Sequence, residues 1–325
     1  MRKHLVVALS LLINCVWAAT VKVSLDQSIQ DAIDSLPNDD SKSIIEIESG
    51  VYDQSIIVKR SNVVFKPSNE GRVTLQTSIK DDSVVLIEST AENVAFYDFD
   101  MINTIGEAAG NQRALKTYGA KLALYNCKVI GFGDTAQLVR GSGYFYNTWV
   151  EGTVDFIYGE YDLYCEGCTI AASGKGALTA ASTLADDVHG GFVFHAANLT
   201  PVVSSIYDKR QENDHSYSSP LNPAEYQHST ILGRPWHNAP RVYFLESYIY
   251  DHIQPYGYDA WEFTDEELAG TFYAEYGNKG PGADTAERVS WAHQLNADEA
   301  APFLSAKTYF NNLNIGIDWI DPDYL

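Results

Sequence analysis

Residues 131–159, GFGDTAQLVRGSGYFYNTWVEGTVDFIYG, are the stretch from which the fold of this chain can be inferred. They contain two aspartates, Asp134 and Asp155, that lie 21 residues apart, and Gln112 precedes the first of them by 22 residues. If the chain coils with a period near this spacing, the three polar side chains stack on successive coils. The spacing therefore predicts an amide and two carboxylates side by side on a coiled β-scaffold.

A weak internal repeat supports this coiling. YNCKVIG at 125–131 resembles YNTWVEG at 146–152, and GCTI at 167–170 resembles both more faintly, at steps of 21 and 20 residues. A repeat of this length holds a few short strands and their turns, which is the unit of a parallel β-helix. The side chains expected to point inward form two ladders, Cys127, Thr148 and Cys168, and Val129, Val150 and Ile170.

Short runs rich in β-branched and aromatic residues fill residues 43–103, with Gly, Asn, Asp and Ser between them. Many short strands also suit a sandwich or a closed barrel, and the repeat is what favours the β-helix. Residues 201–230 are polar and rich in Pro and Ser, which predicts a long surface loop.

Two helices are expected. Ser24 and Gln27 fit a capping box, and apolar residues at helical spacing continue to Pro37, so we expect a helix over 25–36. Such a helix would cap the first coil, which otherwise exposes strand edges and apolar surface. Asn296 is the expected cap of a second, short helix near the end of the chain.

The N-terminus indicates export. Residues 1–18 have a charged start, an apolar run too short to span a bilayer and a small-residue cleavage site, which are the features of a secretory signal peptide. Residues 19–325 are then expected to form a single domain of a secreted protein. The net charge of −21, with 43 acidic residues against 22 Lys and Arg, argues against nucleic acid or an anionic membrane as a partner.

Three cysteines remain once the predicted signal is removed, namely Cys127, Cys165 and Cys168. They are too few for a disulfide framework, so burial must supply most of the stability. The Cys165-x-x-Cys168 pair leaves open a local bridge, a redox pair or half of a metal site. Core thiols or a bridge are favoured over a metal site, because no second such pair is present. Cys127 and Cys168 would lie two coils apart, about 9–10 Å, which is too far for a bridge.

The two aspartates carry chemistry only because of their surroundings. In a chain with 43 acidic residues, a solvated surface charge is the default interpretation of any aspartate. Asp155, however, lies within the apolar run 154–158, interpreted as a strand, and a buried carboxylate there is costly unless it is paired or faces a cleft. With Asp134 one coil away, one carboxylate is pushed toward the neutral acid and the other stays charged. Such a pair suits a general acid and a nucleophile.

Three motifs carry a resemblance to a known family: GFGDT at 131–135, GTVDFIYG at 152–159 and LGRPW at 232–236. They resemble the core motifs of pectin methylesterases, which are carbohydrate esterases, and the likeness covers nearly all of residues 19–325. The resemblance implies an all-β fold, a right-handed parallel β-helix with the N-terminal capping helix and long surface loops. It implies hydrolysis of galacturonate methyl esters in pectin with release of methanol, and no metal or organic cofactor.

The resemblance also implies roles for individual residues. Asp155 would be the nucleophile, and Asp134 would be the general acid and then the base that activates water. Arg234 would keep Asp155 ionised through a charge-assisted hydrogen bond. Gln112 would donate to the developing oxyanion.

The substrate side of the site contains a departure from the family. Trp236 and Tyr158 match aromatic positions that stack on sugar rings. The family reads QDTLY where this chain reads GDTAQ, so Gly133 replaces a second oxyanion glutamine, a loss that typically costs about 10²–10³ in rate. Gln137 replaces the usual tyrosine, is assigned to substrate binding, and would have to fold back to serve the oxyanion.

The favoured hypothesis is therefore a secreted, monomeric pectin methylesterase that acts on methyl-esterified pectin. Because of Gly133, a weak or inactive relative that only binds polysaccharide is the alternative. A β-helix lyase or glycosidase acting on the same polymer is a third possibility. The run Gly141-Ser142-Gly143 lacks the outer glycines of a hydrolase nucleophile elbow, which disfavours a Ser-His-Asp esterase.

Overall fold

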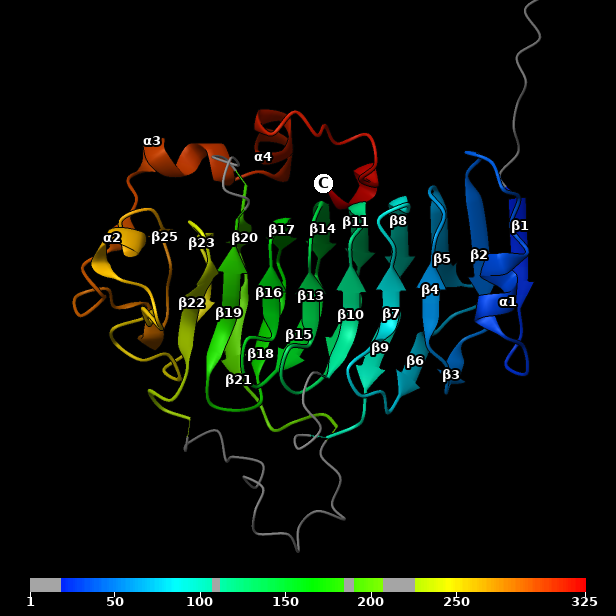
Figure 1. The fold of residues 1–325 in the computed structure, drawn as a ribbon, viewed down its shortest axis with the longest axis horizontal. Helices are drawn as coiled ribbons and strands as arrows, with labels where there is room; N and C mark the ends of the chain where they lie inside the picture. The colour runs from blue at the N-terminus through cyan, green and yellow to red at the C-terminus, as the bar shows by residue number, and fades with distance from the viewer. Residues whose placement is uncertain (1–18, 107–111, 184–189, 207–225) are drawn as a thin grey trace, which may run out of the picture.

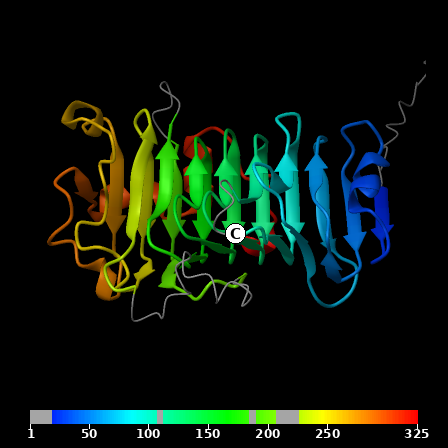
Figure 2. The same ribbon diagram turned by 60° about the horizontal axis from the view of Figure 1, so that its bottom comes forward.

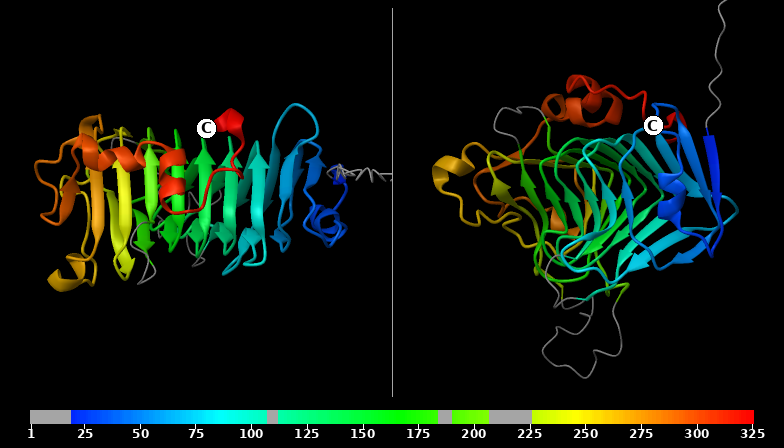
Figure 3. Two further views of the ribbon diagram at one scale, coloured as in Figure 1. Left: turned by 90° about the horizontal axis from the view of Figure 1, so that it is seen from above. Right: turned by 45° about the vertical axis from the view of Figure 1, so that its right-hand side comes forward.

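The computed structural model of the protein describes residues 19–106, 112–183, 190–206 and 226–325. It is a right-handed parallel β-helix in which three parallel sheets run side by side along one long coil, as predicted (Figure 1). The strands follow one another along the long axis in chain order (Figure 2), and the oblique view of Figure 3 shows the sheets enclosing the core. The predicted signal peptide, residues 1–18, lies outside the described residues, as do residues 207–225 of the predicted loop.

The sheets have eleven, seven and eight strands. The first sheet contains β1 (Ala19–Val23), β2 (Ser43–Ile47), β5 (Val63–Pro67), β8 (Glu92–Tyr97), β11 (Ala120–Tyr125), β14 (Ser142–Tyr146), β17 (Asp162–Glu166), β20 (Phe192–His195), β23 (Arg241–Leu245), β25 (Phe272–Tyr276) and β26 (Ala292–Gln294). The second sheet contains β4 (Ile56–Val58), β7 (Ser83–Ile87), β10 (Arg113–Thr117), β13 (Ala136–Leu138), β16 (Ile157–Gly159), β19 (Ala177–Ser182) and β22 (Ile231–His237). The third sheet contains β3 (Gly50–Tyr52), β6 (Val73–Thr77), β9 (Phe99–Asn103), β12 (Lys128–Ile130), β15 (Trp149–Gly152), β18 (Thr169–Ala172), β21 (Asn198–Pro201) and β24 (Tyr248–Ile249).

The strand register confirms the period inferred from the repeat. Leu122 of β11 pairs with Gly143 of β14, which pairs with Leu163 of β17, at steps of 21 and 20 residues. Val129, Val150 and Ile170 likewise pair in register and are fully buried. Each such side chain contributes about 1.5–3 kcal/mol by leaving water, so the ladders supply much of the core stability.

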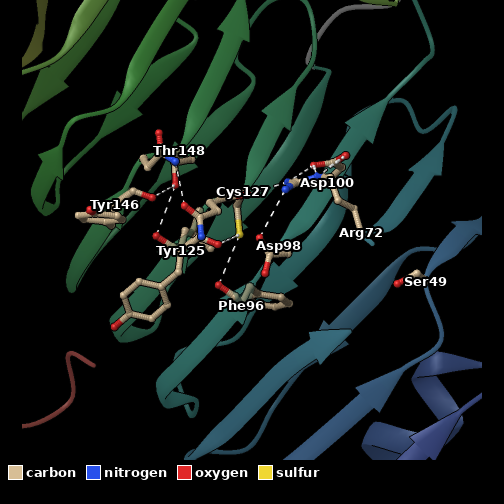
Figure 4. A network of polar contacts seen from close by, with 12 residues as sticks. Ser49, Arg72, Phe96, Asp98, Asp100, Tyr125, Cys127, Tyr146 and Thr148 are labelled. Atoms are coloured by element: carbon tan, nitrogen blue, oxygen red, sulfur yellow. Dashed lines mark hydrogen bonds and ion pairs between the residues drawn. The ribbon is translucent and has the colours of Figure 1, made fainter. Parts of the chain in front are cut away.

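The other predicted ladder is also confirmed, and its polar atoms are satisfied by the backbone. Cys127, Thr148 and Cys168 are all buried. The Cys127 thiol donates to the Phe96 carbonyl at 3.4 Å, and the Thr148 hydroxyl donates to the Tyr146 carbonyl at 3.2 Å (Figure 4). The small polar side chains of this ladder therefore fit inside the coil with a hydrogen-bond partner each.

The three cysteines are free thiols. Cys165 and Cys168 are fully buried and unbridged, which decides between the two favoured alternatives for this pair. Burial raises the pKa of the Cys127 thiol to about 12 and that of Cys165 well above its ordinary value. Buried thiols with a raised pKa are inert, so these residues serve the core and not chemistry.

Asparagines make the turn between the first and third sheets. Asn126 and Asn147 have φ of 55° and 46°, in the left-handed region that Asn tolerates better than most residues. The Asn147 amide donates to the Asn126 side-chain oxygen at 2.8 Å, so the same turn is stacked from one coil to the next. The repeated YN dipeptide of the sequence corresponds to this corner of the coil.

The N-terminal capping helix is present but begins later than expected. Helix α1 spans Ile29–Asp34, and its N-cap is Ser28, whose side chain accepts from the Asp31 N–H. Ser24 and Gln27 do form their hydrogen bonds, but these close a separate turn ahead of the helix. The expected start at residue 25 is therefore wrong. The helix packs against β1, β2 and β4 at the end of the coil (Figure 1).

The C-terminal segment covers the first sheet. It follows α2 (Asp265–Leu268) and the 3₁₀ turn at Pro281–Ala283, and it contains α3 (Ala297–Ala300), the turn at Ala301–Phe303, α4 (Ala306–Asn312) and the turn at Pro322–Tyr324. Asn296 caps α3 in a capping box, as predicted. Tyr309 of α4 donates to the Gly191 carbonyl at 2.8 Å, and Tyr144 of β14 donates to the Tyr324 carbonyl at 2.6 Å. These bonds hold the C-terminal segment across the first sheet (Figures 1 and 3). The outward-facing aromatic side chains of that sheet are buried beneath the segment.

Candidate active site

The outer face of the second sheet carries one row of side chains across five strands. In register from β10 to β22 the row is Lys116, Gln137, Tyr158, Ala180 and Arg234. The preceding residue on β10, β13 and β16 is buried in the core in each case. The alternation of the strands therefore places Gln137, Tyr158 and Arg234 together on the outside of the coil, although they are far apart in the sequence.

The two aspartates lie at the corner where the chain enters this sheet. Asp134 and Asp155 precede β13 and β16 and have φ of 56° and 49°, a left-handed conformation that Asp tolerates. The Asp134 N–H donates to the Val154 carbonyl at 3.1 Å, so the two corners stack on adjacent coils. The structure thus brings the two carboxylates together as the spacing predicts.

One detail of the prediction for Asp155 is wrong. The apolar run 154–158 is not a continuous strand, because β16 begins only at Ile157. The left-handed bend at Asp155 lets its side chain leave the apolar wall, while Phe156 next to it is fully buried. This bend explains how a carboxylate is accommodated among apolar neighbours without being enclosed by them.

Arg234 binds Asp155 through two hydrogen bonds. Its Nε donates to Asp155 Oδ1 at 2.9 Å, and its Nη2 donates to Oδ2 at 2.5 Å. The two side chains are 24% and 13% exposed, so the ion pair is shielded but reachable from solvent. Charge-assisted bonds of this kind are stronger than neutral ones and fix the orientation of the carboxylate.

Trp261 completes this arrangement and was not found by sequence reasoning. Its ring centroid lies 3.7 Å from the guanidinium carbon of Arg234, which is a cation–π contact. It appears in the sequence only as one of many aromatic residues near the C-terminus, with no spacing that relates it to LGRPW.

Asp134 has the electrostatic character of a proton donor. Burial is the main cause that raises its pKa, and the neighbouring charge of Asp155 raises it further. Arg113 and Arg234 oppose these effects, and the pKa of Asp134 is raised to about 6. The pair thus combines an arginine-bound carboxylate with a carboxyl group that keeps its proton in mildly acidic solution.

Gln112 lies beside Gly133, one coil earlier. Its side-chain oxygen accepts from the Gly133 N–H at 2.8 Å, and its side-chain nitrogen donates to the Gly106 carbonyl at 2.8 Å. These bonds hold the amide in a fixed orientation at the corner that leads to Asp134. A Cβ atom added to Gly133 would meet Val154 Cγ1 at 3.5 Å and Gln112 Oε1 at 3.8 Å, which are ordinary contacts.

The three residues assigned to substrate binding lie along the same face. The rings of Tyr158 and Trp236 meet edge to face with centroids 5.5 Å apart. Gln137 lies next to Tyr158 in the row, so it belongs to the same outer face of the sheet. Its side-chain oxygen is buried and has no hydrogen-bond partner among the described residues, so it must become exposed before it can accept from a ligand.

Arg113 is a further residue of the site that sequence reasoning missed. It begins β10 and is 6% exposed. Its Nη1 donates to the Tyr158 hydroxyl at 3.4 Å, and its Nη2 donates to the Asp81 carbonyl at 2.6 Å. A single basic residue after Gln112 gives no spacing signal, so only the coil reveals its position near Asp134.

The fold and the family match identify the chain as a β-helical carboxylic ester hydrolase. The pectinesterase family profile matches residues 16–312, and the chain belongs to the pectinesterase family. Among curated relatives, pectinesterase 31 of Arabidopsis thaliana is 29% identical, covering 87% of this chain and 90% of its own. A pectinesterase of Petunia integrifolia is 28% identical, covering 88% and 76%.

Solved structures share the fold. The deglycosylated pectin methylesterase of Aspergillus niger superposes with a TM-score of 0.75 at 24% identity, covering 94% of this chain and 97% of that one. The carrot pectin methylesterase gives a TM-score of 0.76 at 22% identity, covering 93% and 96%. A pectin methylesterase solved in complex with a hexasaccharide gives 0.68 at 22% identity, covering 90% and 98%.

Proposed function

We propose that this protein removes methyl groups from pectin, with Asp155 as nucleophile and Asp134 as general acid and base. The observation that carries the proposal is the Asp155 carboxylate bound at both oxygens by Arg234, next to an Asp134 whose pKa is raised to about 6. Two neighbouring carboxyl groups with different proton affinities are what a two-step ester hydrolysis requires. Membership of the pectinesterase family supplies the substrate class, the galacturonate methyl ester.

In the first step, an oxygen of the Asp155 carboxylate attacks the ester carbonyl carbon. The carbonyl π electrons move to oxygen, and Gln112, whose amide is fixed beside Gly133, is assigned to donate to that oxyanion. When the tetrahedral intermediate collapses, the bond to the methoxy group breaks and protonated Asp134 gives its proton to that oxygen. Methanol leaves, and an acyl-enzyme anhydride with Asp155 remains.

In the second step, Asp134, now a carboxylate, takes a proton from water as the water attacks the acyl carbon. The bond between Asp155 and the acyl group breaks, which returns Asp155 to its arginine-bound carboxylate and frees the galacturonate acid. Both residues end in their starting protonation states, so the cycle is balanced.

The outer face beside this pair is assigned to the polymer. Trp236 and Tyr158 offer aromatic surfaces for sugar rings, and the Gln137 oxygen would accept from a sugar hydroxyl once it is uncovered. We place the protein outside the cell, as a monomer without a nucleic-acid or membrane partner, on the signal-like residues 1–18 and the net charge of −21. No helix in the described part of the chain is long and apolar enough to cross a membrane.

Methanol release from highly methylated pectin tests the function directly. An esterase yields one methanol and one carboxylic acid per turnover and leaves the chain length unchanged. Shorter chains without methanol would instead indicate a lyase or a glycosidase. If neither product forms, the protein is a binding relative.

The pH dependence should report Asp134. Because the free enzyme needs Asp134 protonated, kcat/KM should be maximal below its pKa and lost as pH rises through about pH 6, by about tenfold per unit. Initial rates of methanol release across pH 4 to 8 check this, with thermal unfolding at each pH as the control. An alkaline limb absent from a protein that stays folded would contradict the acid role of Asp134.

Gly133 is the observation behind the second candidate function, a weakly active or inactive polysaccharide-binding relative. Because a Cβ atom at Gly133 meets only ordinary contacts, Gly133→Gln should fold and supply a second oxyanion donor. We expect kcat to rise, by up to about 10²-fold. Gly133→Leu fills similar space without a donor and should not raise it. An unchanged kcat in an active enzyme would mean that the oxyanion is already fully served.

A further inference from the structure

Arg113 contacts Tyr158, which is assigned to substrate binding, and lies close to the proposed acid and base, Asp134. It is almost fully buried, and its guanidinium reaches two groups from separate parts of the chain. One is the hydroxyl of Tyr158, two strands away on β16, and the other is the carbonyl of Asp81, just before β7. The side chain therefore links β16 to the segment just before β7 through its two hydrogen bonds.

The charged groups around Asp134 come from three strands or their adjoining corners. Asp155 precedes β16, Arg234 lies on β22 and Arg113 begins β10, while Asp134 itself precedes β13. Arg234 is bound to both oxygens of Asp155, so its charge is shared with that carboxylate. Tyr158 also faces Asp134, but burial raises its pKa to about 12, so it is neutral throughout the working range.

We propose that Arg113 is a positioning residue of the esterase site. It holds the Tyr158 ring on the outer face of the second sheet and places a positive charge beside Asp134. The proposal rests on the assignment of Asp134 as acid and base. Arg113 is not assigned a contact with the reacting atoms. It acts through Tyr158, which is assigned to the sugar, and through Asp134, which is assigned the proton transfers.

The proton cycle supplies the reason for this charge. Asp134 must give a proton in the first step and take one in the second, so its proton affinity has to stay near the working pH. Burial and the neighbouring Asp155 both favour the protonated form, and left unopposed they would make Asp134 a poor base. Arg113 lies beside Asp134 on the adjacent coil, because the N–H groups of Gln112 and Ala114 donate to the Gly133 and Thr135 carbonyls at 3.4 and 2.8 Å. Its positive charge offsets both effects.

The pH profile of Arg113 variants tests this inference. In Arg113→Gln the alkaline limb of kcat/KM should move to higher pH by about one unit, because the cation that favours ionised Asp134 is gone. Arg113→Lys keeps the charge and should leave the limb near its wild-type position. Arg113→Met keeps the apolar stem without charge and should shift the limb as Gln does, which provides a second uncharged variant if one of them fails to fold.

Arg60→Gln is the matched control. The Arg60 guanidinium also donates to backbone carbonyls, those of Pro37 and Ser41, but it lies just past β4, three strands from β13. The Arg60→Gln variant should have a lower melting temperature and an alkaline limb of kcat/KM at the wild-type pH. If the alkaline limb does not move in folded Arg113→Gln or Arg113→Met, the inference is wrong. It is also wrong if the limb moves as far in Arg113→Lys as in the uncharged variants. Absence of methanol release by the wild-type protein would instead overturn the proposed function.

Discussion

Replacing Asp155 with asparagine is expected to lower methanol release by about 10⁴- to 10⁶-fold, the loss typical for removal of a catalytic nucleophile. The amide keeps the shape of the carboxylate and can still accept one hydrogen bond from Arg234, but it has no charge with which to attack an ester. Steady-state methanol release from methylated pectin, normalised to folded protein, measures the loss.

The chain offers a close control for this variant. Asp100 on β9 is bound by Arg72 through Nε at 3.0 and 3.2 Å, and it also accepts from the Nη2 of Arg72 (Figure 4). Asp100→Asn therefore loses a similar arginine–carboxylate pair on another sheet, away from the carboxylate site. It should reduce stability and leave activity per folded molecule close to wild type. Wild-type turnover by Asp155→Asn would refute the nucleophile assignment.

Replacing Asp134 with asparagine should cost about 10²- to 10⁴-fold in kcat, the range for general acid–base catalysis. The loss should lie toward the upper end, because Asp134 acts once as acid and once as base. The amide cannot titrate, so the alkaline limb near pH 6 should disappear along with the rate. The residual methanol release of Asp134→Asn between pH 5 and 8 measures both effects.

Asp98→Asn is a suitable comparison for Asp134→Asn. Asp98 also has a left-handed backbone, with φ of 51°, but lies at a different corner of the coil, between β8 and β9. If the strain of that conformation were what matters, the two variants would lose similar activity. We expect only Asp134→Asn to lose it. A wild-type limb retained by Asp134→Asn would assign that limb to another group.

Much of the fold could be predicted because a β-helix is locally repetitive. The YN dipeptides at 125–126 and 146–147 mark successive corners, and the pairing of Val129 with Val150 follows from their spacing alone. The same periodicity brought Asp134 and Asp155 to adjacent coils. Each of these relations depends on residues one repeat apart, so the sequence pattern contains them.

Other features could not be predicted, because they depend on distant or competing contacts. The helix start fails because Gln27 closes a turn with Ser24, which leaves Ser28 as the cap. The strand predicted around Asp155 fails because a left-handed bend replaces the first part of the strand. Trp261 meets Arg234 because the next coil pairs Tyr258 with Gly233 beside β22.

The sequence by itself determined the coil, its inward ladders, the family and the neighbouring positions of the two aspartates, because these follow from a repeat and from short motifs. Only the tertiary structure decided which cations surround Asp134, how Arg234 hydrogen-bonds to Asp155, and that the cysteines stay unbridged. Those properties depend on burial and on distances between side chains from different coils, and no local pattern records either.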